Sequence, residues 1–258
     1  MVKEYLRMMT QNCSILIPAR MESSRLPGKP LKLIEGIPMI VHVAKRASLY
    51  EHASQVIVCT DSAEIILECE KYVVDVINTS NRHRNGTTRI AEAARILNLP
   101  ADHIIIDVQG DEPLVRPEYI ESVHQFLLNT KYGCCVPFQF LEEFNNKNRV
   151  KVISTGDRVL YLTRSDAPTY FSTPFGGYKK HLSIVGFRHE TLQNYVSLPV
   201  GELEAIEHIE LLRLIEHQVQ VGTFEMNGAS IAVDTPEDLE LVRRIMEKDD
   251  IFKYEMGI

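Results

Sequence analysis

A short apolar strand and a basic loop follow one another in Ile15-Leu-Ile-Pro-Ala-Arg-Met-Glu-Ser-Ser-Arg-Leu-Pro-Gly-Lys-Pro-Leu31. The run Ile15 to Ile17 predicts a buried strand, which Pro18 ends. The next dozen residues hold two prolines, one glycine and two serines, so they cannot continue it. A loop after the first strand of an α/β sheet lies at the edge where ligands bind, although a solvated basic loop is the simpler alternative. Three cations make this loop suitable for a polyphosphate: Arg20, Arg25 and Lys29.

Composition limits the classes of protein to which the chain can belong. Its 258 residues, 45% of them hydrophobic, can bury the core of one large domain, or of one domain with a smaller excursion. The net charge of −7 argues against a nucleic-acid-binding surface. No apolar run approaches the roughly 20 residues of a membrane span. Met1 to Asn12 has no signal-peptide core. We therefore expect a cytoplasmic protein with neither a nucleic-acid nor a membrane partner.

The five cysteines are odd in number and lack the spacing of metal ligands. This pattern predicts buried, reduced thiols of a cytosolic protein and argues against a zinc site. The residues concerned are Cys13, Cys59, Cys69, Cys134 and Cys135.

Helices and strands alternate after the basic loop. Apolar residues at helical spacing predict a helix within Gly36 to Tyr50, and the capping residues Thr60 to Ser62 predict another that ends near Glu70. Strands are predicted at Gln55 to Cys59 and at Val73 to Ile77. This order is typical of a parallel sheet with helical crossovers. We predict an α/β, Rossmann-like fold with a mostly parallel sheet flanked by helices, although neither a Walker motif nor Gly-x-Gly-x-x-Gly is present.

A carboxylate follows the most apolar strand of the chain. The stretch His103-Ile-Ile-Ile-Asp-Val-Gln-Gly-Asp-Glu-Pro113 predicts a buried strand, with Gly110 permitting a sharp turn after it. Asp111 would emerge at the carboxyl end of the strand, facing the basic loop. A carboxylate there can hold Mg²⁺, which takes few protein carboxylates and fills its octahedron with water and phosphate. Asp is also common in turns, but the basic loop in register with it favours the metal site.

A second carboxylate precedes the last helix. Asp234 is expected to end a strand, whereas Thr235 and Pro236 start a helix that runs to about Asp249. A helix start accounts fully for the sequence Thr-Pro-Glu-Asp. It accounts less well for an acid directly before the cap.

The second half of the chain is less regular. Residues 166–180 show no periodicity, and we expect about 138–190 to form an excursion that completes a substrate pocket and supports dimerisation. A helix at 202–217 would place Glu204, Glu207 and Glu210 roughly on one face, and for the first two a solvated face is the simplest explanation. The other expected elements are a turn at 85–87, helices at 89–97, 117–128 and 191–196, strands at 133–137, 181–188 and 219–224, and a hairpin about 155–157.

Taken together, the motifs resemble those of the CMP-KDO synthetases, or 3-deoxy-manno-octulosonate cytidylyltransferases. The resemblance rests on Pro-Ala-Arg and Ser-Arg-Leu-Pro-Gly-Lys-Pro-Leu in the basic loop, on Val-Gln-Gly-Asp-Glu-Pro and on Val-Asp-Thr-Pro-Glu-Asp. It implies a fold of the nucleotide-diphospho-sugar transferase type and a homodimer. It also implies Mg²⁺-dependent transfer of CMP from CTP to a 3-deoxy-2-ulosonic acid, with release of pyrophosphate. KDO is the expected acceptor, and lipopolysaccharide or a related glycan the expected end product.

The resemblance also implies roles for individual residues. Arg25 would contact either the triphosphate or the acceptor's carboxylate, and Asp234 would complete the Mg²⁺ site with Asp111. Catalysis would depend on Arg20, Lys29, Asp111 and Asp234. The nucleotide site would consist of Ala19, Arg20, Arg25, Lys29, Gly86, Thr87 and Arg89, and the acceptor site of Gln109, Arg164, His181 and Glu210.

Several positions depart from the family pattern. Asn85 and Thr88 stand where a serine and an acid are usual, which affects either base recognition or helix capping. Val185 and Leu211 replace a tyrosine and a glutamine, which removes polar contacts on the acceptor side. A modified octulosonate or nonulosonate therefore stays open as the acceptor. A sister enzyme acting on a sugar 1-phosphate is a separate alternative, which would not need the Gln-Gly-Asp-Glu-Pro motif. A non-catalytic binding protein is disfavoured because the catalytic acids and Lys29 are all present.

Overall fold

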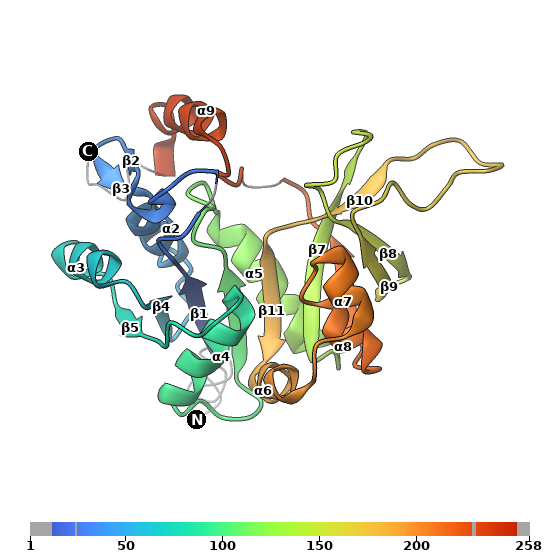
Figure 1. The fold of residues 1–258 in the computed structure, drawn as a ribbon, viewed down its shortest axis with the longest axis horizontal. Coiled ribbons are helices and arrows are strands. Elements are labelled where there is room, and N and C mark those ends of the chain that lie inside the picture. Colours follow the sequence, from blue (N-terminus) through green and yellow to red (C-terminus); the bar gives the residue numbers. More distant parts are fainter. Residues whose placement is uncertain (1–11, 24, 229–230, 252–258) are drawn as a thin grey trace.

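One ten-stranded sheet runs through the protein and carries helices on both faces (Figure 1). The computed structural model describes residues 12–23, 25–228 and 231–251. The predicted absence of a signal peptide concerns a segment that, apart from Asn12, lies outside the described residues. The strands of the large sheet are β1 (Cys13–Pro18), β4 (Gln55–Thr60), β5 (Val76–Asn78), β6 (Ile104–Val108), β7 (Cys134–Leu141), β8 (Lys151–Thr155), β9 (Arg158–Thr163), β10 (Tyr178–His181), β11 (Ile184–Arg188) and β12 (Val221–Glu225).

The helices alternate with the strands in the first half of the chain and cluster near its end. They are η1 (Lys29–Leu31), α2 (Met39–Ala47), α3 (Ala63–Lys71), α4 (Gly86–Ile96), α5 (Pro117–Asn129), α6 (His189–Ser197), α7 (Glu202–Glu207), α8 (Leu212–Glu216) and α9 (Pro236–Met246). A small hairpin of β2 (Leu33–Ile34) and β3 (Ile37–Pro38) lies between η1 and α2. Neither η1 nor this hairpin was predicted from the sequence.

The predicted Rossmann-like architecture is confirmed. The strand order is β10-β8-β9-β12-β7-β11-β6-β1-β4-β5, in which β6, β1, β4 and β5 are parallel neighbours. β11 runs antiparallel between β6 and β7, and β12 is parallel to β7. β10 also pairs with β7, so the strands from β7 to β12 other than β11 form a closed circuit of pairings. The predicted hairpin at 155–157 joins β8 to β9.

The sheet separates two hydrophobic cores because neighbouring side chains of a strand point to opposite faces. On β1, Ile15 and Ile17 enter one core, with residues of α2, α3, α5 and α9, whereas Leu16 enters the other, with residues of α4, α6 and α8. All five cysteines are buried and free, as predicted. Among the described residues, no helix is long and apolar enough to cross a bilayer.

The prediction of one helix at 202–217 is wrong, because the helix is interrupted at His208. That residue takes a left-handed conformation with φ of 52°, which ends α7 before α8 begins. The carbonyl oxygens of Glu207 and His208 accept hydrogen bonds from the guanidinium of Arg164, at 2.8 and 3.2 Å. Arg164 therefore stabilises the end of α7, where unpaired carbonyls and the helix dipole favour a cation.

The predicted solvated face of this helix is also wrong. Glu204 is buried and forms two hydrogen bonds with the guanidinium of Arg213, at 2.7 and 2.6 Å. Glu207 accepts from the hydroxyl of Thr163 at 2.6 Å and from the backbone N–H of Arg164 at 2.9 Å. Both acids therefore hold the helix against β9 and α8 rather than facing solvent.

Three strand predictions need correction. The strand expected at 181–188 is divided at residues 182–183 into β10 and β11, and both parts continue along β7. The strand expected at 73–77 begins only at Val76, because Val73 takes a positive φ of 57° at the end of α3. Residues 231–233, the described residues directly before Asp234, form no strand, but the N–H of Val233 donates to the carbonyl of Asp111 at 2.9 Å. The helix after Asp234 has the predicted cap at Thr235 and ends at Met246.

Candidate active site

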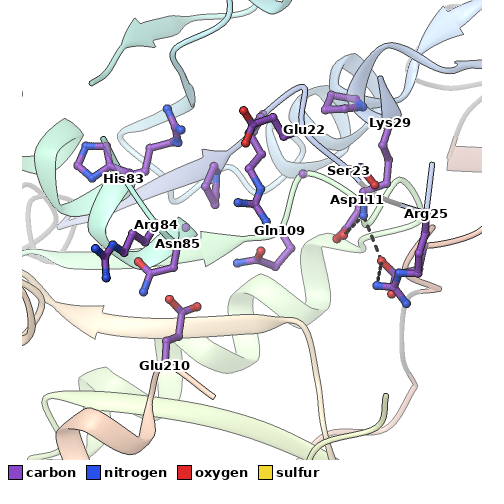
Figure 2. A pocket seen from close by; sticks show the side chains of 18 residues that line it. Glu22, Ser23, Arg25, Lys29, His83, Arg84, Asn85, Gln109, Asp111 and Glu210 are labelled. Carbon is purple, nitrogen blue, oxygen red and sulfur yellow. Dashed lines mark hydrogen bonds and ion pairs between the residues drawn. The ribbon is translucent and has the colours of Figure 1, made fainter. Parts of the chain in front are cut away.

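A cleft of about 580 Å³ opens where β1 and β6 end (Figure 2). Because these strands are parallel, their carboxyl ends bring the basic loop and the segment after β6 to one edge of the sheet. Except for Thr87, every residue predicted for catalysis or nucleotide binding lines this cleft. The lining includes Ala19, Arg20, Arg25, Lys29, Gly86, Arg89, Asp111 and Asp234.

Lys29 joins the two acids at one end of the cleft. Its Nζ atom lies 2.6 Å from Oδ2 of Asp111 and 3.2 Å from Oδ1 of Asp234. Arg25 places a guanidinium nitrogen 3.0 Å from the same oxygen of Asp234. Burial opposes the charge of Lys29, but Asp111 and then Asp234 outweigh burial and raise the pKa of the ammonium group. Lys29 is therefore a cation in the free protein.

Backbone contacts fix the positions of the two acids. The carbonyl of Asp111 accepts from Val233 as described above, and the N–H of Asp234 donates to Oδ2 of Asp238 at 3.1 Å. Gly110 is needed for close approach rather than for a turn of unusual φ, because a Cβ atom there would lie 2.8 Å from the carbonyl oxygen of Pro18. A larger residue at this position would push Asp111 away from the basic loop.

The two carboxylates fit a hard divalent cation. Both reach the same atom, Lys29 Nζ, within 3.2 Å, so both can approach one ion. No group of three or more potential metal-binding side chains occurs in the part of the chain that the structure describes. Asp111 and Asp234 would thus supply two oxygens, and water and phosphate the rest, which is how Mg²⁺ is usually bound with nucleotides.

The other predicted nucleotide residues lie at the start of α4. Arg89 is buried, donates to the hydroxyl of Thr79 at 2.7 Å and pairs with Asp61 at 2.9 Å. Thr87 is buried beneath the cleft. The departure at Asn85 is explained by capping, since its side-chain oxygen accepts from the N–H of Thr88 at 2.9 Å. The predicted turn at 85–87 is therefore the first turn of α4.

A second cavity of about 500 Å³ adjoins the first. All four predicted acceptor residues line it, and so do Val185 and Leu211, the two apolar departures from the family pattern. Both cavities share the residues Arg84, Asn85, Gln109 and Glu210. The structure thus brings together the four residues that were predicted to bind the acceptor, next to the cleft that holds the predicted nucleotide residues.

The chain is similar to known proteins of one family. A family model described as cytidylyltransferase matches residues 14–255. The chain belongs to the cytidylyltransferase family. It is 39% identical to the 3-deoxy-manno-octulosonate cytidylyltransferase of a Nitratiruptor species, over 88% of this chain and 97% of that protein. The enzyme of the same name from Neisseria meningitidis (serogroup C) is 37% identical, over 90% of this chain and 97% of its own.

Solved structures of cytidylyltransferases share the fold of this chain. A CMP-2-keto-3-deoxy-manno-octonic acid synthetase in complex with CTP superimposes with a TM-score of 0.85 at 36% identity, over 92% of this chain and 98% of that one. A cytidylyltransferase from Leptospira borgpetersenii shares the fold at 17% identity, with a TM-score of 0.63 over 93% of this chain and 88% of that one. The family resemblance seen in the motifs is confirmed.

Glu210 of this cytidylyltransferase lies between the two cavities. Burial raises the pKa of its carboxyl, although hydrogen bonds from the hydroxyl and N–H of Thr87 partly offset this. Its Oε2 atom is buried and has no hydrogen-bond partner among the described residues. A buried oxygen of this kind is suited to accept a hydrogen bond from a bound ligand.

His181 and Arg164 differ in what they offer a ligand. Burial, and then Lys180, lower the pKa of His181 to about 4, so its ring is neutral at pH 7. Arg164 uses three guanidinium nitrogens for backbone carbonyls, since it also donates to Lys147 at 3.0 Å. His181 can donate or accept a hydrogen bond, whereas Arg164 mainly holds the wall of the cavity in place.

Asp107 is a buried acid next to the site that was not predicted from the sequence. It lies within β6 and accepts a hydrogen bond from the side-chain nitrogen of Gln109 at 2.9 Å. Burial, and then Glu210 and Asp111, raise the pKa of its carboxyl well above the usual value. Asp107 therefore orients Gln109. The sequence feature that could have revealed Asp107 is an acid inside an otherwise apolar strand, where carboxylates are rare.

Proposed function

We propose that this cytidylyltransferase transfers CMP from CTP to KDO and releases pyrophosphate. The observation that carries the proposal is the cluster of Lys29, Asp111 and Asp234 in a cleft joined to a second cavity through Gln109 and Glu210. The relatives' names and the CTP complex of the similar synthetase support the same nucleotide and acceptor.

The proposed reaction is an in-line displacement at the α-phosphorus. The anomeric oxygen of the acceptor forms a bond to that phosphorus, the bond to the bridging oxygen breaks, and pyrophosphate leaves with the electron pair. The hydroxyl proton passes to solvent. Such transfers depend on positioning and charge neutralisation rather than covalent catalysis. Arg20, Arg25 and Lys29 would bind the triphosphate, while Gln109, His181 and Glu210 would bind acceptor hydroxyls.

Asp111 and Asp234 would hold Mg²⁺ in this proposal. Bound there, the ion would supply positive charge to the reacting phosphate. Arg89 and Thr87, with Ala19 and Gly86, would form the floor against which the nucleotide lies. The side chain of Arg89 would keep its conformation when the nucleotide binds, because Thr79 and Asp61 hold its guanidinium.

The test is a pyrophosphate-release assay with CTP, ATP, GTP and UTP, combined with KDO, other ulosonic acids and sugar 1-phosphates. We expect turnover with CTP and KDO that disappears when EDTA removes divalent cations and returns with added Mg²⁺. Turnover with a sugar 1-phosphate but not with an ulosonic acid would replace this proposal by a sister activity. CTP binding without turnover of any acceptor would indicate a non-catalytic protein.

A modified octulosonate or nonulosonate is the second candidate acceptor. Val185 and Leu211 are 6% and 4% exposed and present apolar walls to the second cavity. An apolar wall suits a deoxy, methyl or acetamido group, and it deprives a hydroxyl of a hydrogen bond. We place KDO first because Gln109, Arg164, His181 and Glu210 are retained together.

We also propose that residues 138–190 complete the acceptor pocket and support a homodimer. Several residues of this range line the second cavity, among them Val150, Arg164 and Ser183. The segment between β9 and β10 projects away from the sheet in Figure 1 and carries Phe171, which is 96% exposed. Sedimentation equilibrium should give a dimer mass that falls towards the monomer in Phe171→Ser, and a wild-type monomer would contradict this.

A cytoplasmic location and a role in lipopolysaccharide synthesis stay predictions.

A further inference from the structure

Arg84 stands at the junction of the two cavities. It lies two residues before α4 and is one of the four residues that line both the nucleotide cleft and the acceptor cavity. Its side chain is exposed and has no hydrogen bond or ion pair with any residue that the structure describes. Figure 2 shows Arg84 beside Asn85 and on the Glu210 side of the cleft, away from Lys29 and Asp111.

The other arginines of the acceptor cavity are already engaged. Arg164 donates to the carbonyls of Lys147, Glu207 and His208 at the end of α7. Arg213 is held by both carboxylate oxygens of Glu204 and lies over the ring of Tyr195, 4.3 Å from its centre. A guanidinium committed in this way has lost most of its capacity for a ligand carboxylate. His181 cannot supply the charge, because its ring is neutral at pH 7.

The acceptor class proposed above requires a cation at this place. In a 2-ulosonic acid the carboxylate and the anomeric hydroxyl are attached to the same carbon. The hydroxyl must reach the nucleotide cleft to attack the α-phosphorus, so the carboxylate must lie at the junction too. Glu210 lies at the same junction, and two carboxyl groups placed side by side cannot both be ionised without cost unless a cation lies beside them. A free guanidinium matches a carboxylate in charge and in geometry.

We infer that Arg84 binds the carboxylate of the acceptor and thereby positions its anomeric hydroxyl towards the nucleotide. This inference rests on the proposed function and adds a residue to it. Arg84 would take the role that Arg25 or Arg164 could not fill. Arg25 lies beside Asp234 at the far end of the cleft, away from the junction (Figure 2), and Arg164 is held by backbone carbonyls.

The test compares Arg84→Gln and Arg84→Lys with Arg82→Gln, which removes an exposed arginine of the same segment that lines neither cavity. We expect Arg84→Gln to raise KM for KDO about tenfold or more, with KM for CTP changed less than about twofold. Arg84→Lys should recover part of the loss because it restores the charge but not the bidentate geometry. Arg82→Gln should match the wild type.

A second measurement separates carboxylate binding from a structural effect. The carboxamide of KDO lacks the negative charge, so wild type should use it much less well than KDO. Arg84→Gln should reduce this preference about fivefold or more, because the residue that recognises the charge is gone. An unchanged preference, or a loss confined to KM for CTP, would overturn the inference. Failure of the proposed function is a distinct result, since the wild type itself would then show no turnover of KDO.

Discussion

Lys29 Nζ lies 2.6 Å from Oδ2 of Asp111, although the two residues are 82 positions apart in the chain. With Arg25 and Asp234 they form a cluster in which two cations balance two carboxylates. Such a cluster keeps the cations at the cleft without leaving a charge unpaired. In the proposed reaction, Lys29 and Arg25 would become available to phosphate once the two carboxylates ligated Mg²⁺. The cluster thus explains why acids and cations are both concentrated at this end of the cleft.

The acids of the cluster give the first prediction. Asp111→Asn and Asp234→Asn should each lower kcat about 100-fold or more, because each removes a charged oxygen ligand. Both variants should keep the wild-type melting temperature within a few degrees, since neither side chain is in the core. They should also lose the thermal stabilisation that Mg²⁺ and CTP together give the wild type. Asp102→Asn, at an exposed position, is the control, and near-normal activity of Asp111→Asn would contradict the metal site.

Lys29 gives the second prediction. Lys29→Ala should raise KM for CTP about tenfold or more, with a much smaller change in KM for KDO, because the ammonium group is expected to contact the triphosphate. Steady-state kinetics with each substrate varied in turn measures this. Lys32→Ala is the matched control in the same segment. Equal increases in both KM values would show that Lys29 serves to fold the loop.

The buried acid Asp107 gives a prediction about pH. Its carboxyl has a raised pKa in the folded protein, so the folded state holds a proton that the unfolded state releases above about pH 4. Stability from this group is therefore greatest at low pH and is lost as the pH rises towards the folded-state pKa. Asp107→Asn removes the effect and keeps an oxygen that can accept from Gln109.

Chemical denaturation of Asp107→Asn and wild type between pH 4 and pH 8 tests this. The variant should gain in stability relative to the wild type as pH rises, by about 1.4 kcal/mol for each unit by which the folded protein raises the pKa, until the pH reaches that pKa. Asp102→Asn, at an exposed position, is the control. A constant difference across the pH range would mean that Asp107 is ionised in the folded protein.

Leu211 gives a prediction about the acceptor. If KDO is the substrate and other side chains supply its contacts, Leu211→Gln should not improve kcat/KM for KDO. It should also destabilise the fold by about 1–3 kcal/mol, because it buries an amide in the core around α8. Leu203→Gln, on the partly exposed face of α7, is the control. A gain for KDO together with a loss for acetamido or deoxy analogues would instead favour the modified sugar.

The buried pair of Glu204 and Arg213 gives a prediction about stability. These side chains are only 10% and 8% exposed, so Glu204→Gln leaves the guanidinium of Arg213 without its counter-ion. We expect a loss of about 3 kcal/mol in the free energy of unfolding, measured with urea. Glu121→Gln, at an exposed position of α5, should stay within about 0.5 kcal/mol of wild type. A similarly small effect at Glu204 would mean that water solvates the pair.

Local sequence was sufficient to predict those elements that follow a simple pattern of apolar or capping residues. The apolar runs around Ile15 and Ile106 specified two neighbouring strands, because a fully buried strand needs uninterrupted apolar residues. Ser62 and Thr235 each cap a helix, since a side-chain oxygen can satisfy an N–H that the helix leaves unpaired. The basic loop and Asp111 were predicted to face one another because parallel strands end at the same edge.

Tertiary structure decided what depends on residues distant in the chain. The segment from Glu202 to His217 has the composition of one helix, yet the helix is interrupted at His208. There Arg164, more than 40 positions away in the chain, donates hydrogen bonds to the carbonyls that the helix leaves unpaired. Spacing alone could not show this, because the alternative hydrogen bonds come from another element. The same reason applies to Arg84. Its availability became visible only when the structure showed that Arg164 and Arg213 are bound elsewhere.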